Sequence, residues 1–181
     1  MNRNYLIIGN PIEHSLSPKI HNFWFNENNI NATYKKETLS ESKLENLVKR
    51  IKEGDISGAN VTVPFKQKII PFLDKLSDLA KKTQSVNTLY KEDNLVVGDN
   101  TDVYGFSQSI LNQNISLKNK DALIVGAGGV VPSVITALED LSVRKIYIKN
   151  RTQEKLLKLK ETFANISPLE WDQEIDCDIV I

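Results

Sequence analysis

Residues 122–129 of the chain read Ala-Leu-Ile-Val-Gly-Ala-Gly-Gly, a short apolar run that ends in a cluster of glycines. The run has the length and residue types of a buried strand, and the segment from Val130 to Leu141 has the apolar spacing of a helix. A strand, a glycine-rich turn and a helix in this order bring backbone N–H groups and the positive end of a helix to a place where a pyrophosphate can bind. A tight strand-to-helix turn without a ligand is the alternative.

The next strand, predicted for Lys145–Ile148, leads into Asn150-Arg151-Thr152 rather than into the acidic residue that binds the adenosine ribose in NAD sites. A guanidinium group binds a 2′-phosphate through paired N–H donors, and Thr152 adds a hydroxyl at the start of the next predicted helix. These residues favour NADP over NAD, and a solvated basic turn is the alternative. Val131 stands where the usual fingerprint has its third glycine.

Along the whole chain, short apolar runs alternate with segments of helical period, which predicts an α/β fold with a mostly parallel sheet. We expect two domains: a substrate-binding, catalytic domain at residues 1–102, and a partial dinucleotide-binding Rossmann domain at residues 103–181. The second has roughly half the length of a complete Rossmann domain, and its sequence stops in an apolar strand. We therefore expect a truncated chain, in which the open edge of the second sheet favours association, such as a homodimer.

Within the first part, the sequence predicts strands at Tyr5–Ile8, Ala32–Tyr34 and Gly58–Val63, followed by a hairpin of Val86–Tyr90 and Leu95–Val97 at the sheet edge. The predicted helices are Pro18 to about Asn28 with Ser17 as N-cap, a helix opened by a capping box of Ser42 and Glu45 with the apolar stripe Leu44, Leu47, Val48 and Ile51, and helical turns from Pro64 to about Lys82 that Pro71 interrupts. In the second part, a helical linker of Val103, Phe106, Ile110 and Leu111 precedes the helix from Val130 to Leu141, and a further helix is predicted at about Gln153–Phe163.

The composition disfavours several classes of protein. The 181 residues are 40% apolar and 25% charged, and 23 basic residues balance 23 acidic ones, so we expect no nucleic-acid or membrane partner. The single cysteine, Cys177, excludes an internal disulfide and fits a reducing cytosol, which predicts a cytoplasmic protein. No apolar run approaches the ~18 residues of a membrane span. The two histidines have no carboxylates arranged with them as metal ligands, so we expect no metal site.

Polar side chains at predicted strand ends in the first part suit a polyol or carboxylate ligand. Ser15 and Ser17 offer two hydroxyls in a loop that leads into a helix, although Ser17 also fits a plain N-cap. Thr62 shares one side of a strand end with Asn60. Asn87 offers both a donor and an acceptor to a hydroxyl group.

Lys66 is expected in the first turn of a helix, where the positive helix end disfavours a cation. Such a position favours use of the lysine in proton transfer, and an ordinary surface lysine is the alternative. Asp102 either caps the helix that follows it or faces Lys66. In the second case the carboxylate orients the ammonium group, and the two side chains act as a general acid–base pair.

Together these segments resemble the shikimate dehydrogenase family over nearly the whole chain. Six motifs occur in the family's order and at its spacing, a combination that is highly specific. They are Gly9-Asn10-Pro11-Ile12-x-His14-Ser15-x-Ser17-Pro18-x-x-His21-Asn22, Asn60–Lys66, Val86-Asn87-Thr88, Gly98-x-Asn100-Thr101-Asp102-x-x-Gly105, Gly126–Gly129 and Asn150-Arg151-Thr152.

The resemblance implies a reversible, NADPH-dependent reduction of 3-dehydroshikimate to shikimate, on the route to chorismate and the aromatic amino acids. It implies a small-molecule substrate whose carboxylate is bound by Ser15 and Ser17, and whose ring hydroxyls are bound by Thr62, Lys66, Asn87 and Asp102. The pair of Lys66 and Asp102 would handle the proton. The residues implied to bind the cofactor are Asp78, Gly126, Ala127, Gly128, Gly129, Val130, Asn150, Arg151 and Thr152.

One departure from the family concerns Val130-Val131-Pro132-Ser133, which stands where the family has small residues followed by a basic one. We therefore expect weak NADPH binding. Two further alternatives stay open. One is a quinate/shikimate dehydrogenase that uses NAD, against which Arg151 argues, and the other is a non-catalytic module that binds shikimate without turnover.

Overall fold

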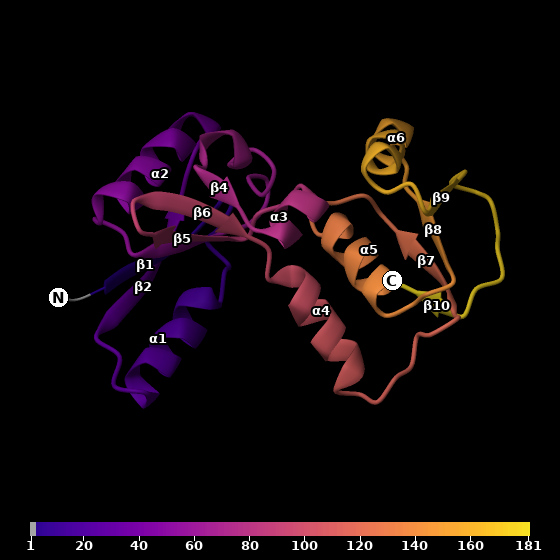
Figure 1. Ribbon diagram of the computed structural model, residues 1–181, viewed down its shortest axis with the longest axis horizontal. Helices are drawn as coiled ribbons and strands as arrows, with labels where there is room; N and C mark the ends of the chain where they lie inside the picture. Colours follow the sequence, from indigo (N-terminus) through magenta and orange to yellow (C-terminus); the bar gives the residue numbers. More distant parts are fainter. Residues whose placement is uncertain (1–2) are drawn as a thin grey trace. The chain divides into compact units, whose positions relative to one another are not determined.

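The computed structural model describes residues 3–181, and the chain divides into two compact units, one that ends at Asn100 and one that runs from Thr101 to Ile181. Each unit has its own sheet with helices packed on it (Figure 1). The second sheet is wholly parallel, and the first combines parallel and antiparallel pairs. The predicted α/β class with mostly parallel strands is therefore confirmed.

The sheet of the first unit has the strand order β2-β1-β3-β5-β6-β4. Its strands are β1 (Arg3–Gly9), β2 (Ala32–Thr38), β3 (Gly58–Val61), β4 (Lys75–Leu76), β5 (Thr88–Glu92) and β6 (Leu95–Asp99). β1 is parallel to both β2 and β3, and the predicted hairpin of β5 and β6 adds antiparallel to β3. The prediction that this hairpin forms the edge is wrong, because β4 pairs with β6 beyond it.

Alternation along β1 distributes apolar side chains to the two faces of this sheet. Leu6 and Ile8 belong to the core that α2 (Leu44–Glu53) completes with a stripe of buried side chains. Ile7 belongs to a smaller cluster that includes Tyr34 of β2 and Phe25 of α1 (Ser17–Glu27). The sheet therefore has α2 on one face and α1 on the other, as Figure 1 shows.

Two predicted helix starts in this unit are wrong. Ser17 is the first residue of α1 and Leu16 is its N-cap, so Ser17 is no cap. The capping box of Ser42 and Glu45 does not form, because Ser42 lies in the short 3₁₀ turn η1 (Glu41–Lys43) that precedes α2. In line with the predicted interruption at Pro71, the segment from Pro64 to Lys82 is divided into turns, the 3₁₀ turn η2 (Ile70–Phe72), β4 and α3 (Asp78–Thr83).

The second unit has a parallel sheet in the order β10-β7-β8-β9. Its elements are α4 (Asp102–Leu111), β7 (Asp121–Val125), α5 (Val131–Asp140), β8 (Lys145–Lys149), α6 (Gln153–Thr162), β9 (Ile166–Leu169) and β10 (Ile179–Val180). The helices agree with the predicted spans to within one residue at each end. β9 is not predicted from the sequence, because Pro168 interrupts its strand pattern.

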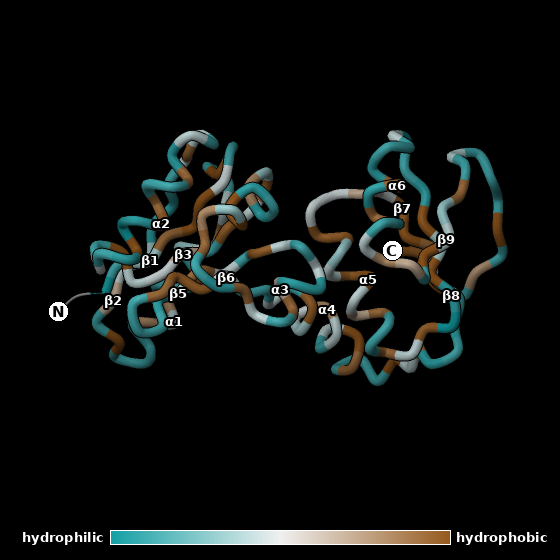
Figure 2. The backbone as a smooth tube through the Cα atoms, turned by 45° about the horizontal axis from the view of Figure 1, so that its top comes forward, coloured by the Kyte–Doolittle hydropathy of each residue, from teal (hydrophilic) through white to brown (hydrophobic). Residues whose placement is uncertain are grey.

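Eight consecutive residues of α5, 131–138, are buried, which makes this helix the centre of the second core. Figure 2 shows hydrophobic stretches along the strands of both units and hydrophilic segments between them. No helix within residues 3–181 is long and apolar enough to cross a membrane.

Candidate functional site

Two loops of the first unit begin side by side at the carboxyl ends of the neighbouring strands β1 and β3. β1 and β3 are parallel neighbours in which Ile8 pairs with Val61, so the chain leaves both strands at the same level. The Thr62 N–H donates to the Ile8 carbonyl at 2.9 Å, and the Asn10 N–H donates to the Val63 carbonyl at 3.1 Å. These backbone bonds hold the loop after β1 against the loop after β3.

A cavity of about 410 Å³ lies between these two loops. Three residues predicted to bind substrate line it: Ser15, Ser17 and Thr62. The remaining lining residues, which sequence analysis left without an individual role, are Ile7, Asn10, Pro11, Ile12, His14 and Val63. The mixture of three hydroxyls with apolar side chains suits a small ligand that has an apolar ring face and polar substituents.

The two serines form a hydroxyl pair at the start of α1. Ser15 Oγ lies 3.2 Å from Ser17 Oγ, to which it donates, and accepts the backbone N–H of Ser17 at 3.3 Å. Both side chains are half-buried. The pair therefore offers closely spaced oxygens of the kind that can bind the two oxygens of a carboxylate.

Lys66 and Asn87 lie next to each other at the end of the adjacent strand pair. The Val86 N–H donates to the Lys66 carbonyl at 2.8 Å, and the Val61 N–H donates to the Asn87 carbonyl at 2.8 Å. Both Lys66 and Asn87 are half-buried. The set of residues that lines the cavity, as far as residues 3–181 are concerned, includes neither of them. The structure thus brings Ser15, Ser17 and Thr62 to one cavity, and Lys66 and Asn87 to the next strand ends along the same sheet.

The expected helix at Lys66 is wrong. Lys66 lies in an isolated turn, in which the Ile69 N–H donates to the Phe65 carbonyl at 3.0 Å, and Pro71 follows directly within η2. A proline cannot donate the backbone bond that would extend the helix. One turn has no aligned series of peptide dipoles, so the argument from a helix end does not apply to this lysine.

Asp102 is the first residue of α4 and belongs to the second unit. The expectation that it caps α4 is wrong, because Thr101 occupies the N-cap position. Just before it, Asn100 is buried, and its amide donates to the Ser85 carbonyl at 2.8 Å and to Thr83 Oγ1 at 3.2 Å. These bonds fix the point at which the chain leaves the first sheet.

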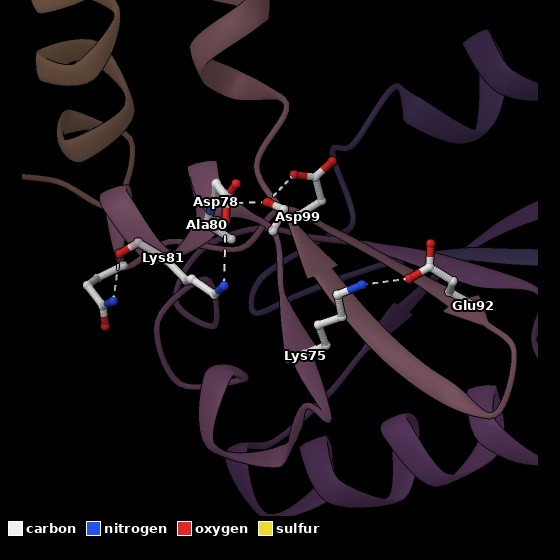
Figure 3. A network of polar contacts seen from close by, with 8 residues as sticks. Lys75, Asp78, Ala80, Lys81, Glu92 and Asp99 are labelled. Carbon is white, nitrogen blue, oxygen red and sulfur yellow. Dashed lines mark hydrogen bonds and ion pairs between the residues drawn. The ribbon is translucent and has the colours of Figure 1, made fainter.

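Asp78, which the resemblance places near the cofactor, is the first residue of α3. Its side chain is fully exposed, and its carboxylate lies 3.5 Å from the Nζ of Lys81. The neighbouring Ser77 is the residue that organises this helix end: its hydroxyl accepts the Ala80 N–H at 3.1 Å and donates to the Asp99 carboxylate at 2.5 Å (Figure 3).

The glycine loop of the second unit connects β7 to the ten-residue helix α5. Gly126 has a φ of +128°, a conformation that favours glycine. A Cβ added at Gly126, Gly128 or Gly129 would meet no other atom within 4 Å. The backbone of this loop is therefore open to close approach, and its residues fit the pyrophosphate of a dinucleotide. Val130, at the end of the loop, keeps 48% of its surface exposed.

The second predicted cofactor segment follows β8, the neighbour of β7. Val125 pairs with Lys149, and the Gly126 N–H donates to the Lys149 carbonyl at 2.8 Å. The Asn150 amide donates to the Thr152 carbonyl at 2.9 Å and shapes the turn, in which Arg151 is exposed. The turn and the glycine loop thus leave adjacent strands at the same level.

Comparisons with known proteins find matches to both parts of the chain. Residues 7–89 match the model of the shikimate dehydrogenase substrate-binding domain, and residues 107–180 match the model named shikimate / quinate 5-dehydrogenase. Among solved structures, shikimate 5-dehydrogenase from Thermus thermophilus, in complex with NADP(H) and shikimate, superposes with a TM-score of 0.88 and 28% identity. The match covers 98% of this chain and 67% of that structure.

Two curated relatives are named shikimate dehydrogenase (NADP(+)). The one from Pelagibacter ubique is 51% identical over 181 residues, which are 100% of this chain and 68% of the relative. The one from Clostridium beijerinckii is 40% identical over 177 residues, which are 98% of this chain and 66% of the relative. The chain therefore spans about two thirds of the length of these relatives. Given this identity along its whole length, the chain belongs to the shikimate dehydrogenase family.

Proposed function

We propose that this chain binds shikimate and 3-dehydroshikimate in its first unit and interconverts them with NADPH or NADP⁺ held by its second unit. The observation that carries the proposal is the gathering of Ser15, Ser17 and Thr62 around one cavity of about 410 Å³. A volume of this order suits a single six-membered ring with small substituents. In this assignment the serine pair binds the carboxylate, and Thr62 binds a ring hydroxyl.

The proton step belongs to Lys66, with Asp102 as its partner. Reduction of the ketone needs a hydride at the carbonyl carbon and a proton at the carbonyl oxygen. As negative charge develops on that oxygen, the Lys66 ammonium stabilises it and donates the proton. Asp102 is kept as a member of the acid–base pair from the family resemblance alone. In the reverse direction the neutral amine takes the proton from the hydroxyl. Asn87, beside Lys66 at the strand ends, binds a ring hydroxyl of the substrate.

The cofactor supplies the hydride, and the residues of the second unit would hold it. The open backbone of Gly126, Ala127, Gly128 and Gly129, with Val130, supports binding of the pyrophosphate. Asn150, Arg151 and Thr152, at the end of the adjacent strand, would bind the 2′-phosphate. Asp78 is kept as a member of the cofactor site from the family resemblance alone.

Two measurements test this proposal. Calorimetric titration of the chain with shikimate tests the first unit, and NADPH consumption in the presence of 3-dehydroshikimate tests turnover. We expect Lys66→Ala to lower turnover by about 10²-fold or more, because it removes the proton donor, with only a modest loss of shikimate affinity.

The matched control is Lys68→Ala, which removes an exposed lysine two residues further along the chain that pairs with Glu41. Turnover that survives Lys66→Ala unchanged would remove Lys66 from the mechanism. Shikimate binding without NADPH consumption would support a binding module in place of a dehydrogenase. Absence of shikimate binding would overturn the whole proposal.

A further inference from the structure

A chain of hydrogen bonds inside the first unit leads to the side chain of Asn87. The Tyr34 hydroxyl donates to Asn60 Oδ1 at 2.6 Å, and Asn60 Nδ2 donates to both the Asn87 carbonyl and Thr88 Oγ1 at 3.2 Å. The Thr88 hydroxyl then donates to Asn87 Oδ1 at 3.0 Å. The series starts at the edge strand β2, crosses β3 and ends at the start of β5.

The direction of the bond between Tyr34 and Asn60 follows from one backbone carbonyl. The carbonyl of Asn87 can only accept, so the Asn60 atom 3.2 Å from it must be the amide nitrogen. The Asn60 oxygen therefore faces Tyr34, and the phenol must donate. Burial raises the pKa of Tyr34, so the phenol keeps its proton throughout the neutral range.

Thr88 connects Asn60 to the side chain of Asn87. Its hydroxyl oxygen accepts from Asn60 Nδ2 at 3.2 Å, and its own proton is donated to Asn87 Oδ1 at 3.0 Å. An asparagine amide has two nearly isosteric orientations, and a neighbouring donor to its oxygen selects one of them. With its oxygen bound to Thr88, the Asn87 side chain turns its NH₂ group to the opposite end as a hydrogen-bond donor.

Tyr34, at the head of the series, is held from two sides by α1. Its ring is only 4% exposed and stacks on His21, with centroids 4.2 Å apart and planes 5° apart. The Asn22 amide donates to the Tyr34 carbonyl at 2.8 Å and accepts the Tyr34 N–H at 2.9 Å. Ser17, the first residue of α1, lines the cavity. The same helix therefore contributes one residue to the cavity and holds Tyr34 in place.

We propose that Thr88 is a positioning residue, which fixes the Asn87 amide as a hydrogen-bond donor so that this part of the site selects a ligand oxygen that accepts. Asn60 and Tyr34 support Thr88 in this role. The inference rests on the proposed function for the identity of the ligand, whereas the orientation of the amide is a property of the chain itself. A ring hydroxyl at this place accepts a hydrogen bond from the Asn87 NH₂ group through its oxygen. A substituent that can only donate finds no acceptor there and binds poorly.

The test replaces Thr88 in the full chain and measures both the amide and the ligand. Thr88→Val removes the donor at nearly constant shape, and Thr88→Ser retains it. We expect the NMR order parameter of the Asn87 NH₂ group to fall in Thr88→Val and to be restored in Thr88→Ser. The same exchange at Thr33 of β2 is the control for a general effect of a valine in this sheet.

The ligand measurement uses shikimate and analogues that each lack one ring hydroxyl. Thr88→Val should weaken shikimate binding by about tenfold, in line with the loss of one hydrogen bond. It should leave unchanged the affinity for the analogue that lacks the hydroxyl bound by Asn87. A merely structural effect would weaken binding of all the ligands alike.

The outcomes separate the two proposals. If wild-type chain fails to bind shikimate, the proposed function is overturned, while the NMR measurement still decides the role of Thr88. If the Asn87 amide is equally ordered in wild type and in Thr88→Val, the inference is overturned whatever the ligand does. An equal loss of affinity for shikimate and for every analogue would likewise overturn it.

Discussion

Gly9 shows how closely the cavity is built at the level of single atoms. A Cβ added at this residue would lie 2.7 Å from Thr62 Cγ2 and 3.1 Å from the Val63 carbonyl oxygen. Both contacts are shorter than ordinary van der Waals separations, so a side chain here must displace the loop after β3. Thr62 is one of the three hydroxyl residues that line the cavity.

We expect Gly9→Ala to destabilise the first unit by about 1–3 kcal/mol through this overpacking and to weaken shikimate binding as Thr62 moves. Urea unfolding and calorimetric titration check the two effects. Gly105→Ala is the control, since a Cβ there would meet no other atom within 4 Å, and alanine in helix α4 should stabilise by up to about 1 kcal/mol. Equal stability of Gly9→Ala and wild type would contradict the steric argument.

His21 gives the protein a pH dependence in the mildly acidic range. Burial lowers the pKa of His21 below its ordinary value of 6.5, so the folded state resists the proton that the unfolded chain takes up. Its contribution to stability is therefore complete above pH 6.5 and is lost as the pH falls through the lowered pKa. Carboxyl groups titrate in a separate window, with ordinary values near 4.

The measurement is urea unfolding between pH 8 and pH 5. His21→Phe keeps an aromatic ring against Tyr34 and removes the titration, so its stability should fall less over this range than that of the wild type. Parallel curves for the two proteins would show that His21 does not carry the effect.

Among the elements, α5 contains a polar atom that the second core does not satisfy. Thr136 Oγ1 is buried, and within residues 3–181 it has no hydrogen-bond partner. Replacement of such a hydroxyl by a methyl group of similar shape removes a desolvation cost. We therefore expect Thr136→Val to stabilise the second unit by about 1 kcal/mol. Thermal unfolding checks this, with Thr136→Ser as the control that retains the hydroxyl. Destabilisation by valine would contradict the prediction, because it would mean that the Thr136 hydroxyl makes a stabilising hydrogen bond.

The sequence predicted elements well where one regular pattern extended over the whole element. In α2 the buried stripe of Leu44, Leu47, Val48 and Ile51 matches the predicted period, and α5 and α6 agree within a residue at each end. The prediction was wrong where a short turn intervened, as at the 3₁₀ turn before α2. It also missed two strands. β4 has only two residues and therefore no recognisable period, and in β9 Pro168 interrupts the strand pattern.

The candidate site was predictable as a set of residues but not as a geometry. Hydroxyls at the ends of predicted strands indicated Ser15, Ser17 and Thr62, and the parallel pairing of β1 with β3 explains why they meet. The support from Tyr34 was not predictable, because this residue lies far away in sequence and reaches Asn87 only through Asn60 and Thr88.

At the scale of the whole molecule, the two units have separate hydrophobic cores, and among residues 3–181 no buried residue belongs to both. We therefore expect two transitions in a calorimetric scan. Shikimate at about 100 times its Kd should stabilise the first unit by about 2.7 kcal/mol and leave the second transition in place. NADPH should shift the second transition only slightly, because Val130-Val131-Pro132-Ser133 stands where the family has small residues followed by a basic one.

A shift of both transitions by shikimate alone would contradict this division of labour between the units. Submicromolar NADPH binding, measured by isothermal titration, would contradict the expected effect of Val130 and Val131.

The backbone bond from Gly126 to the carbonyl of Lys149 bears on how nucleotide preference can change in this protein. It involves no side chain, so residues 150–152 are open to exchange while the glycine loop keeps its conformation. On the proposal that Arg151 binds the 2′-phosphate, an acidic residue in its place would favour a ribose hydroxyl over a phosphate. Preference between NADP and NAD would then depend on a few side chains of this turn and not on the backbone of the glycine loop.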